Sequence, residues 1–167
     1  MANLAKDIMR WLDHPANEQG RPADQAAYFD KLWNDLILEI QRIEGCEAPM
    51  DYEADFARLA QYSGPLYRIH QEFEQEYPFG VVENTSFVSW TKQKDFLDFS
   101  WLEKGKEMLL IEGKAEFPDI GIDLVGIKKW ANKYDHPLSF NQFEAEQEVV
   151  FPLMFENIVD MKIKELA

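Results

Sequence analysis

The spacing of apolar residues changes its period once along this chain, near Gly64-Pro65. Before this point apolar residues recur every three or four positions, as on the buried face of a helix. After it, the apolar residues form short runs, as in strands, and at 159–163 they alternate with polar residues. The pattern predicts an α+β fold in a single domain spanning 1–167, with a helical part at 1–64 and a β-rich part at 65–167.

Three helices are expected in the first part of the chain. Amphipathic patterns at 4–12 and 29–43 stop at Pro15 and Gly45, and Asp51 is a candidate cap for a third helix. The tryptophans at positions 11 and 33 fit the apolar stripes of these helices, which favours a place in the core. In the second part, strands are predicted at 66–73, 86–90, 108–113, 148–151 and 159–163, with helices at 93–102 and 123–134.

Composition narrows the classes of function. The chain has 17 Lys and Arg against 31 Asp and Glu, a net charge of −14, so its field repels nucleic acid phosphates and no direct DNA binding is expected. Cys46 is the only cysteine, which excludes an internal disulfide and a cysteine-built metal site. No apolar run approaches the roughly 20 residues that cross a membrane, and the first residues lack a signal-peptide core. We therefore expect a cytoplasmic protein with no membrane partner, acting in its own cell or in a host cell.

Carboxylates directly precede the apolar segment 149–153. In an extended chain Glu146 and Glu148 would point to one side and Gln147 to the other, and Glu144 shares the parity of both glutamates. Like charges held close together repel one another and cost stability, which favours a functional use. The alternative is a solvated strand end in an acidic protein.

Three segments of the second part occur in a recognisable order. They are Leu66-Tyr67-Arg68-Ile69-His70, Phe87-Val88-Ser89-Trp90-Thr91 and Glu146-Gln147-Glu148-Val149-Val150-Phe151-Pro152. This order resembles the mono-ADP-ribosyltransferases of the arginine–serine–glutamate group, which includes binary-toxin components, vertebrate ecto-enzymes and bacteriophage enzymes. The chain departs from that group in having Ile69 where glycine is common, and Trp90-Thr91 where Thr-Ser usually follows the serine.

The resemblance implies an ADP-ribosyltransferase-like fold. In that fold, N-terminal helices pack on a core of two small mixed or antiparallel sheets that open an NAD cleft. It also implies an NAD-dependent enzyme, with NAD as substrate and no metal. Glu148 would bind the 2′-hydroxyl of the nicotinamide ribose and stabilise the oxocarbenium-like transition state. Ser89 would position Glu148, and Glu146 would orient or deprotonate an acceptor arginine.

The remaining site residues are also assigned by the resemblance. Arg68 would hold the NAD phosphates, for which a planar guanidinium is well suited, with Tyr67 and Ile69 beside it in the cofactor site. Phe140 and Phe143 would contact the target protein ahead of the Glu-x-Glu motif. The implied biology is a phage or bacterial effector, and the acceptor is an arginine of a protein, for example a basic nucleic-acid-handling protein. RNA remains an alternative acceptor.

Two other classes of function stay open on the sequence. A charge of −14 also fits a non-enzymatic immunity protein or nucleic-acid mimic that occupies a basic cleft. Asp98 with Glu112 and Lys114 resembles the acid and Glu-x-Lys pattern of metal-dependent nucleases, in which the acids bind magnesium. The predicted helix at Asp98 and the net charge argue against the nuclease.

Overall fold

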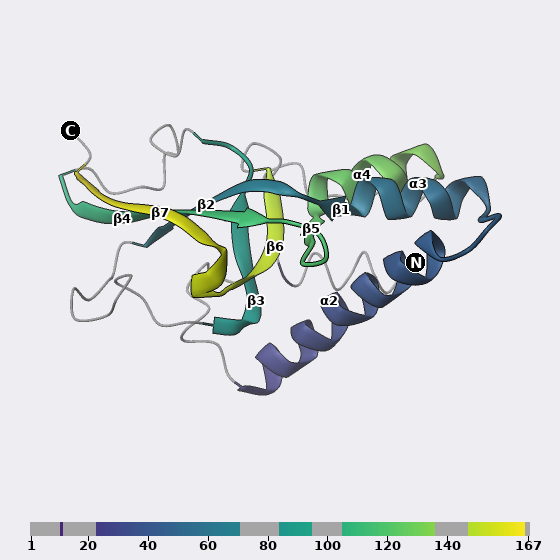
Figure 1. Ribbon diagram of the computed structural model, residues 1–167, viewed down its shortest axis with the longest axis horizontal. Helices are drawn as coiled ribbons and strands as arrows, with labels where there is room; N and C mark the ends of the chain where they lie inside the picture. Colours follow the sequence, from purple (N-terminus) through teal and green to yellow (C-terminus); the bar gives the residue numbers. More distant parts are fainter. Residues whose placement is uncertain (1–10, 12–22, 71–83, 95–104, 136–146, 166–167) are drawn as a thin grey trace.

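The computed structural model describes Trp11 and residues 23–70, 84–94, 105–135 and 147–165. In this part of the chain three helices pack at one end of a curled antiparallel sheet, which confirms the α+β class (Figure 1). The elements are α2 (Ala23–Glu44), α3 (Asp51–Ala60), β1 (Gln61–Tyr62), β2 (Gly64–His70), β3 (Asn84–Thr91), β4 (Glu107–Ala115), β5 (Gly121–Asp123), α4 (Leu124–Lys133), β6 (Glu148–Leu153), the short 3-10 helix η4 (Phe155–Asn157) and β7 (Ile158–Glu165).

The seven strands form one sheet in the order β1-β5-β6-β3-β2-β4-β7. Its narrowest join lies between β2 and β3, whose register holds the single pair Tyr67 and Thr91, whereas β2 and β4 pair along the whole of β2. On either side of this join the strands run in different directions: β3 and β6 cross the direction of β2, β4 and β7 in Figure 1. The two separate sheets that we expected are therefore two parts of one sheet.

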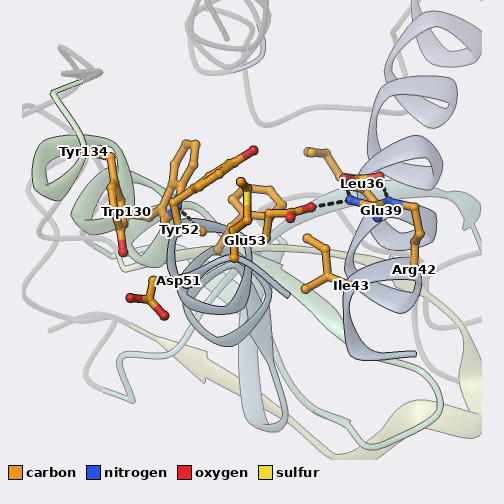
Figure 2. Close-up of a pocket in the computed structure, with 11 residues that line it drawn as sticks. Leu36, Glu39, Arg42, Ile43, Asp51, Tyr52, Glu53, Trp130 and Tyr134 are labelled. Carbon is orange, nitrogen blue, oxygen red and sulfur yellow. Dashed lines mark hydrogen bonds and ion pairs between the residues drawn. The ribbon is translucent and has the colours of Figure 1, made fainter. Parts of the chain in front are cut away.

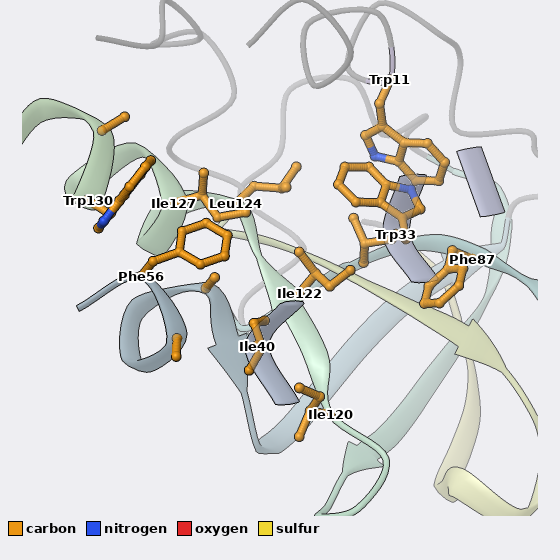
Figure 3. Packing of buried hydrophobic residues seen from close by; sticks show 14 of the residues in the cluster. Trp11, Trp33, Ile40, Phe56, Phe87, Ile120, Ile122, Leu124, Ile127 and Trp130 are labelled. Carbon is orange, nitrogen blue, oxygen red and sulfur yellow. The ribbon is translucent and has the colours of Figure 1, made fainter. Parts of the chain in front are cut away.

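The main core lies between the helices and one face of the β3, β5 and β6 part of the sheet (Figure 3). Along α2, the side chains of Phe29, Trp33 and Ile40 are at helical spacing and buried, as the sequence pattern predicted. They pack with Ile122 and Val150 of the sheet. A hydrogen bond from the backbone N–H of Phe87 to the carboxylate of Asp30, 3.1 Å, also ties β3 to α2.

Side chains alternate between the two faces of β3 and β6, so each of these strands contributes residues to two cores. Phe87 and Val150 belong to the main core, whereas Val88, Trp90 and Phe151 belong to a second cluster on the opposite face of the sheet. By the same alternation Ser89 and Glu148 share the helix-facing side of the sheet with Phe87 and Val150, on neighbouring strands. This placement brings two of the predicted site residues together.

Several boundaries differ from the sequence prediction. Asp51 is the first residue of α3 and does not cap it; the N-cap is Met50, which makes no side-chain capping bond. Asp123 is the residue that caps a helix: its carboxylate accepts from the backbone N–H of Gly126 in α4, 3.0 Å. Gly121–Asp123, where no strand was predicted, forms strand β5, which pairs with β1 directly after α3. Strands of two and three residues are too short to show alternation in a sequence.

The expectation that the chain is extended from Glu146 through Glu148 is also wrong, at Gln147. Gln147 has φ 49°, in the left-handed region that side chains other than glycine rarely adopt, and β6 begins only at Glu148. The alternation argument therefore cannot be carried across Gln147. Of the helix predicted at 93–102, Gln93 and Lys94 are not helical and the remainder lies outside the described residues.

Candidate functional site

Ser89 and Glu148 are hydrogen-bonded to each other across two neighbouring strands. In the register of β3 and β6, Ser89 is opposite Val150 and Thr91 is opposite Glu148, so the two site residues are diagonal neighbours on one face. The hydroxyl of Ser89 donates to Oε1 of Glu148. The pairing of the strands therefore fixes the orientation of this carboxylate.

Trp11 supplies a second donor to the same carboxylate. Its indole Nε1 donates to Oε1 of Glu148 at 3.0 Å, and both side chains are buried, with Glu148 6% exposed. The indole is held by edge-to-face contacts with Phe29, at 5.1 Å between ring centroids, and with Trp33, at 5.4 Å. Donors of this kind are what a buried carboxylate requires. Trp11 is thus a functional candidate that the sequence placed only in the core.

Arg68 belongs to β2, and its side chain reaches across the narrow join to β3. Its guanidinium Nη1 donates to the backbone carbonyl of Ser89, and its Cζ lies 5.9 Å from the centre of the Trp90 ring. The side chain is buried, at 8% exposed. The structure therefore brings Arg68, Ser89 and Glu148 together, through the backbone of Ser89 on one side and its hydroxyl on the other.

His70 is a further neighbour of Arg68. The Nε of Arg68 donates to Nε2 of His70 at 3.3 Å, which requires the imidazole to be neutral at that nitrogen. Burial, and then the positive charge of Arg68, lower the pKa of His70 to about 3. His70 therefore stays an uncharged acceptor at neutral pH and helps to orient the guanidinium, a role that the sequence did not single out.

Tyr67 is opposite Thr91 in the register of β2 and β3, and so lies on the face of the sheet that carries Ser89 and Glu148. The side chains of Tyr67 and Ile69 lie on the other face of β2 from Arg68. They alternate with Arg68 along β2 and pack with Met108 and Leu110 in a separate apolar cluster. Burial, and then the charge of Glu112, raise the pKa of Tyr67. The assignment of Tyr67 and Ile69 to the cofactor site stays a prediction.

The two departures from the family pattern have clear places in the structure. The side chain of Ile69 lies on the face away from Arg68, so the bulk that replaces a glycine does not crowd the guanidinium. Trp90 is buried in the second core, where its Nε1 donates to the carbonyl of Phe151 at 3.0 Å. Its ring fills the space beside Gly113, where an added Cβ would come within 2.9 Å of it. Trp90 is therefore a fixed platform beside Arg68.

Several predicted residues lie outside the described part of the chain: Glu146, Phe140, Phe143 and Asp98. Of the nuclease pattern, Glu112 and Lys114 lie on one side of β4, and Lys114 makes an ion pair with Glu116 at 3.7 Å. Among the described residues no three acidic, histidine or cysteine side chains gather as a metal site would need. Likewise, no described helix is long and apolar enough to cross a membrane.

A cavity of 720 Å³ lies away from this cluster, between α2, α3 and α4 (Figure 2). Its lining includes Arg42, Tyr52 and Trp130, and none of Arg68, Ser89 and Glu148 borders it. The structure thus has two distinct features to explain: a hydrogen-bonded cluster within the sheet and an open cavity among the helices.

Comparison of the chain with known protein families, with characterised proteins and with solved structures finds no match. The chemistry of the cluster therefore has to be argued from its residues.

Proposed function

We propose that this protein is an NAD-dependent mono-ADP-ribosyltransferase that transfers ADP-ribose to a macromolecular acceptor, in the first place an arginine of a protein. The observation that carries the proposal is the link from Arg68 through Ser89 to Glu148. Ser89 is the link between the other two residues: its backbone carbonyl accepts from Arg68, 21 positions before it, and its hydroxyl donates to Glu148, 59 positions after it. This link supports the roles that the resemblance to the arginine–serine–glutamate group assigns to Ser89 and Glu148.

The chemistry suits a fixed buried carboxylate. Cleavage of the bond between nicotinamide and ribose leaves the bonding electron pair on the nicotinamide nitrogen and positive charge on the ribose. Glu148, oriented by Ser89 and Trp11 in a desolvated position, would stabilise that charge more strongly than a solvated carboxylate could. A nitrogen of the acceptor arginine then forms the new bond to the ribose carbon and gives its proton to a base, for which we propose Glu146.

The shape of the sheet supports the same proposal. The strands diverge on either side of the single β2–β3 pair, and Arg68 and Ser89 are at this join. We propose that NAD binds here, with its phosphates on Arg68 and its nicotinamide ribose towards Glu148, in an ADP-ribosyltransferase-like fold. The carboxylate is 6% exposed, so the ribose can reach it only if groups that cover it move aside on binding.

The test is turnover of labelled NAD in the presence of a cell lysate. Glu148→Gln keeps the size of the side chain and removes its charge, so transfer should fall a hundredfold or more, in line with about 2.7–4 kcal/mol for an electrostatic stabiliser. Glu112→Gln, on β4, serves as the matched control and should remain active. Near-normal transfer by Glu148→Gln would contradict the proposal, and an equal loss in Glu112→Gln would show that the effect is not specific to Glu148.

A further inference from the structure

The cavity among the helices has an aromatic lining and exposed apolar edges. Tyr52, Phe56, Trp130 and Tyr134 contribute to its walls, and Phe56 and Trp130 make an edge-to-face contact at 5.0 Å. At its edge Met50 is 62% exposed and Tyr52 is 46% exposed. Large apolar side chains exposed beside a concave surface are typical of binding sites. We call this feature the helical groove.

The walls of the helical groove are held in place by polar contacts between helices. Arg42 of α2 donates to Glu39 at 2.7 Å on its own helix and to Glu53 of α3 at 2.6 Å (Figure 2). On the other side, Nε1 of Trp130 in α4 donates to the carbonyl of Tyr52 in α3 at 2.7 Å. The groove is therefore formed before any ligand arrives, which lowers the entropy cost of binding.

The side chains that line the helical groove carry a net negative charge. Its lining contains the carboxylates of Glu39, Asp51 and Glu53 and the single guanidinium of Arg42. Arg42 is already engaged by Glu39 and Glu53. No cation of the described residues makes an ion pair with Asp51, which is therefore available to a charged ligand.

We propose that the helical groove binds a basic amphipathic segment of a partner protein. An apolar side chain of that segment would occupy the aromatic lining beside Met50 and Tyr52, and a lysine or arginine would pair with Asp51. The net charge of −14 steers such a segment towards the protein and repels acidic ligands and a second copy of this chain. The surface is separate from Glu148 and Arg68, so this inference does not depend on the proposed reaction with NAD.

The test uses fluorescein-labelled peptides of one length and fluorescence anisotropy at fixed salt concentration. The probe is an amphipathic peptide of leucine and lysine; a serine and lysine peptide has the same charge without apolar groups, and a leucine and glutamate peptide has the opposite charge. We expect the leucine and lysine peptide to bind at least about tenfold more tightly than either comparison peptide, a difference of about 1.4 kcal/mol.

Matched variants locate the binding. Met50→Ser and Asp51→Asn should each weaken binding of the leucine and lysine peptide by about tenfold or more, within the usual range for a contact at the centre of an interface. Leu38→Ser is the control for Met50→Ser, because Leu38 is 61% exposed on α2 but does not line the groove. Glu156→Gln, at an exposed acid of η4, is the charge-matched control for Asp51→Asn. Both controls should bind like the wild-type protein.

Four outcomes would overturn the inference. If the leucine and lysine peptide does not bind, or binds no more tightly than the serine and lysine peptide, the groove does not take up apolar side chains. If Asp51→Asn and Glu156→Gln weaken binding of the peptide equally, the effect comes from the net charge of the protein and not from the groove. A mass in light scattering that grows with protein concentration and is lost in Met50→Ser would show that a second copy of the chain covers the groove. Circular dichroism melts of each variant establish that the fold is intact.

Discussion

Trp11 and Glu148 are 137 positions apart in the chain and meet in the core. A carboxylate that is 6% exposed is costly unless donors surround it, and the indole N–H and the serine hydroxyl both reach the same oxygen. If Glu148 is the stabilising carboxylate, Trp11 is a positioning residue that acts through it. Ser89 has the same kind of role from the strand side.

Trp11→Phe tests this role. Phenylalanine keeps an aromatic ring against Phe29 and Trp33 but cannot donate a hydrogen bond, and loss of a bond to a charged group costs about 1.5–3 kcal/mol. We expect kcat for NAD turnover to fall about tenfold or more while KM for NAD changes little. Trp33→Phe, in the same cluster, is the control for packing and should leave kcat nearly unchanged. Equal loss in both variants would show that Trp11 acts only by packing.

From the lowered pKa of His70 we expect the stability of the protein to depend on pH. The pKa of this histidine is lowered to about 3 by burial and by Arg68, whereas an unfolded histidine titrates near its ordinary value of 6.5. Above pH 6.5 the imidazole is neutral in both states. As the pH falls below 6.5 the unfolded state takes up a proton that the folded state does not, so the free energy of unfolding decreases, by up to about 1.4 kcal/mol for each pH unit.

The measurement is urea unfolding of the wild-type protein and of His70→Gln between pH 6.5 and pH 5.5, where ordinary carboxylates are still mostly ionised and both proteins carry the same ones. Glutamine can still accept from Arg68 but does not titrate in this range. The wild-type protein should lose stability over this interval more steeply than the variant. Parallel curves for the two proteins would contradict the assignment of a neutral, buried His70.

At the scale of elements, α3 and α4 approach closely because Gly126 has no side chain. A Cβ at this position would lie 1.7 Å from the carbonyl oxygen of Leu59 in α3, far inside contact distance and against backbone. The same pair of helices is joined at its other end by Asp55, which accepts from Lys133 and Tyr134 at 2.6 Å each. These contacts fix the two walls of the helical groove relative to each other.

Gly126→Ala is therefore expected to destabilise the protein, although alanine is the better helix former by about 1 kcal/mol. The helices must separate to admit the methyl group, and overpacking of this kind costs about 1–3 kcal/mol or more. A thermal melt should show a lower Tm, by about 2–4 °C for each kcal/mol lost. Lys129→Ala, at an exposed position of α4, gives the effect of helix propensity alone. A Gly126→Ala protein as stable as Lys129→Ala would show that the two helices can move apart without cost.

At the scale of the whole molecule, the sheet changes direction at the one β2–β3 pair, and the proposed NAD site is at that join. Binding of NAD to the folded state alone should raise stability by about 2.7 kcal/mol when NAD is at a hundred times its Kd. For a chain of this size this corresponds to an increase in Tm of several degrees. A thermal melt with and without millimolar NAD measures it.

Arg68 should carry much of this increase, since a planar guanidinium binds phosphate oxygens in pairs and lysine offers a single ammonium. Arg68→Ala should nearly abolish the NAD-induced increase in Tm and Arg68→Lys should reduce it, each compared with its own melt without NAD. Arg58→Ala, at a surface ion pair with Asp55, should respond to NAD like the wild-type protein. A wild-type protein that neither responds to NAD nor consumes it would leave the acidic binding protein and the metal-dependent nuclease as the alternatives.

The sequence by itself determined the elements whose residues carry a long periodic pattern. The apolar stripe of α2 and the short apolar run of Phe87, Val88 and Trp90 were sufficient to predict a helix and a strand. Burial of one face imposes the period of a helix, and burial of both faces of a strand gives a nearly continuous apolar run. The order of Arg68, Ser89 and Glu148 was also readable, since it lies along the chain.

Only the tertiary structure decided which residues meet. The bond from Trp11 to Glu148, the contact of Arg68 with His70 and Trp90, and the approach of α4 to Leu59 join segments whose separation in sequence carries no period. The strands β1 and β5 exist through their pairing with each other and, for β5, with β6, because two or three residues have too little propensity to form a strand alone. Local pattern fixes which face of an element is buried, and the packing of those faces then selects the contacts between distant residues.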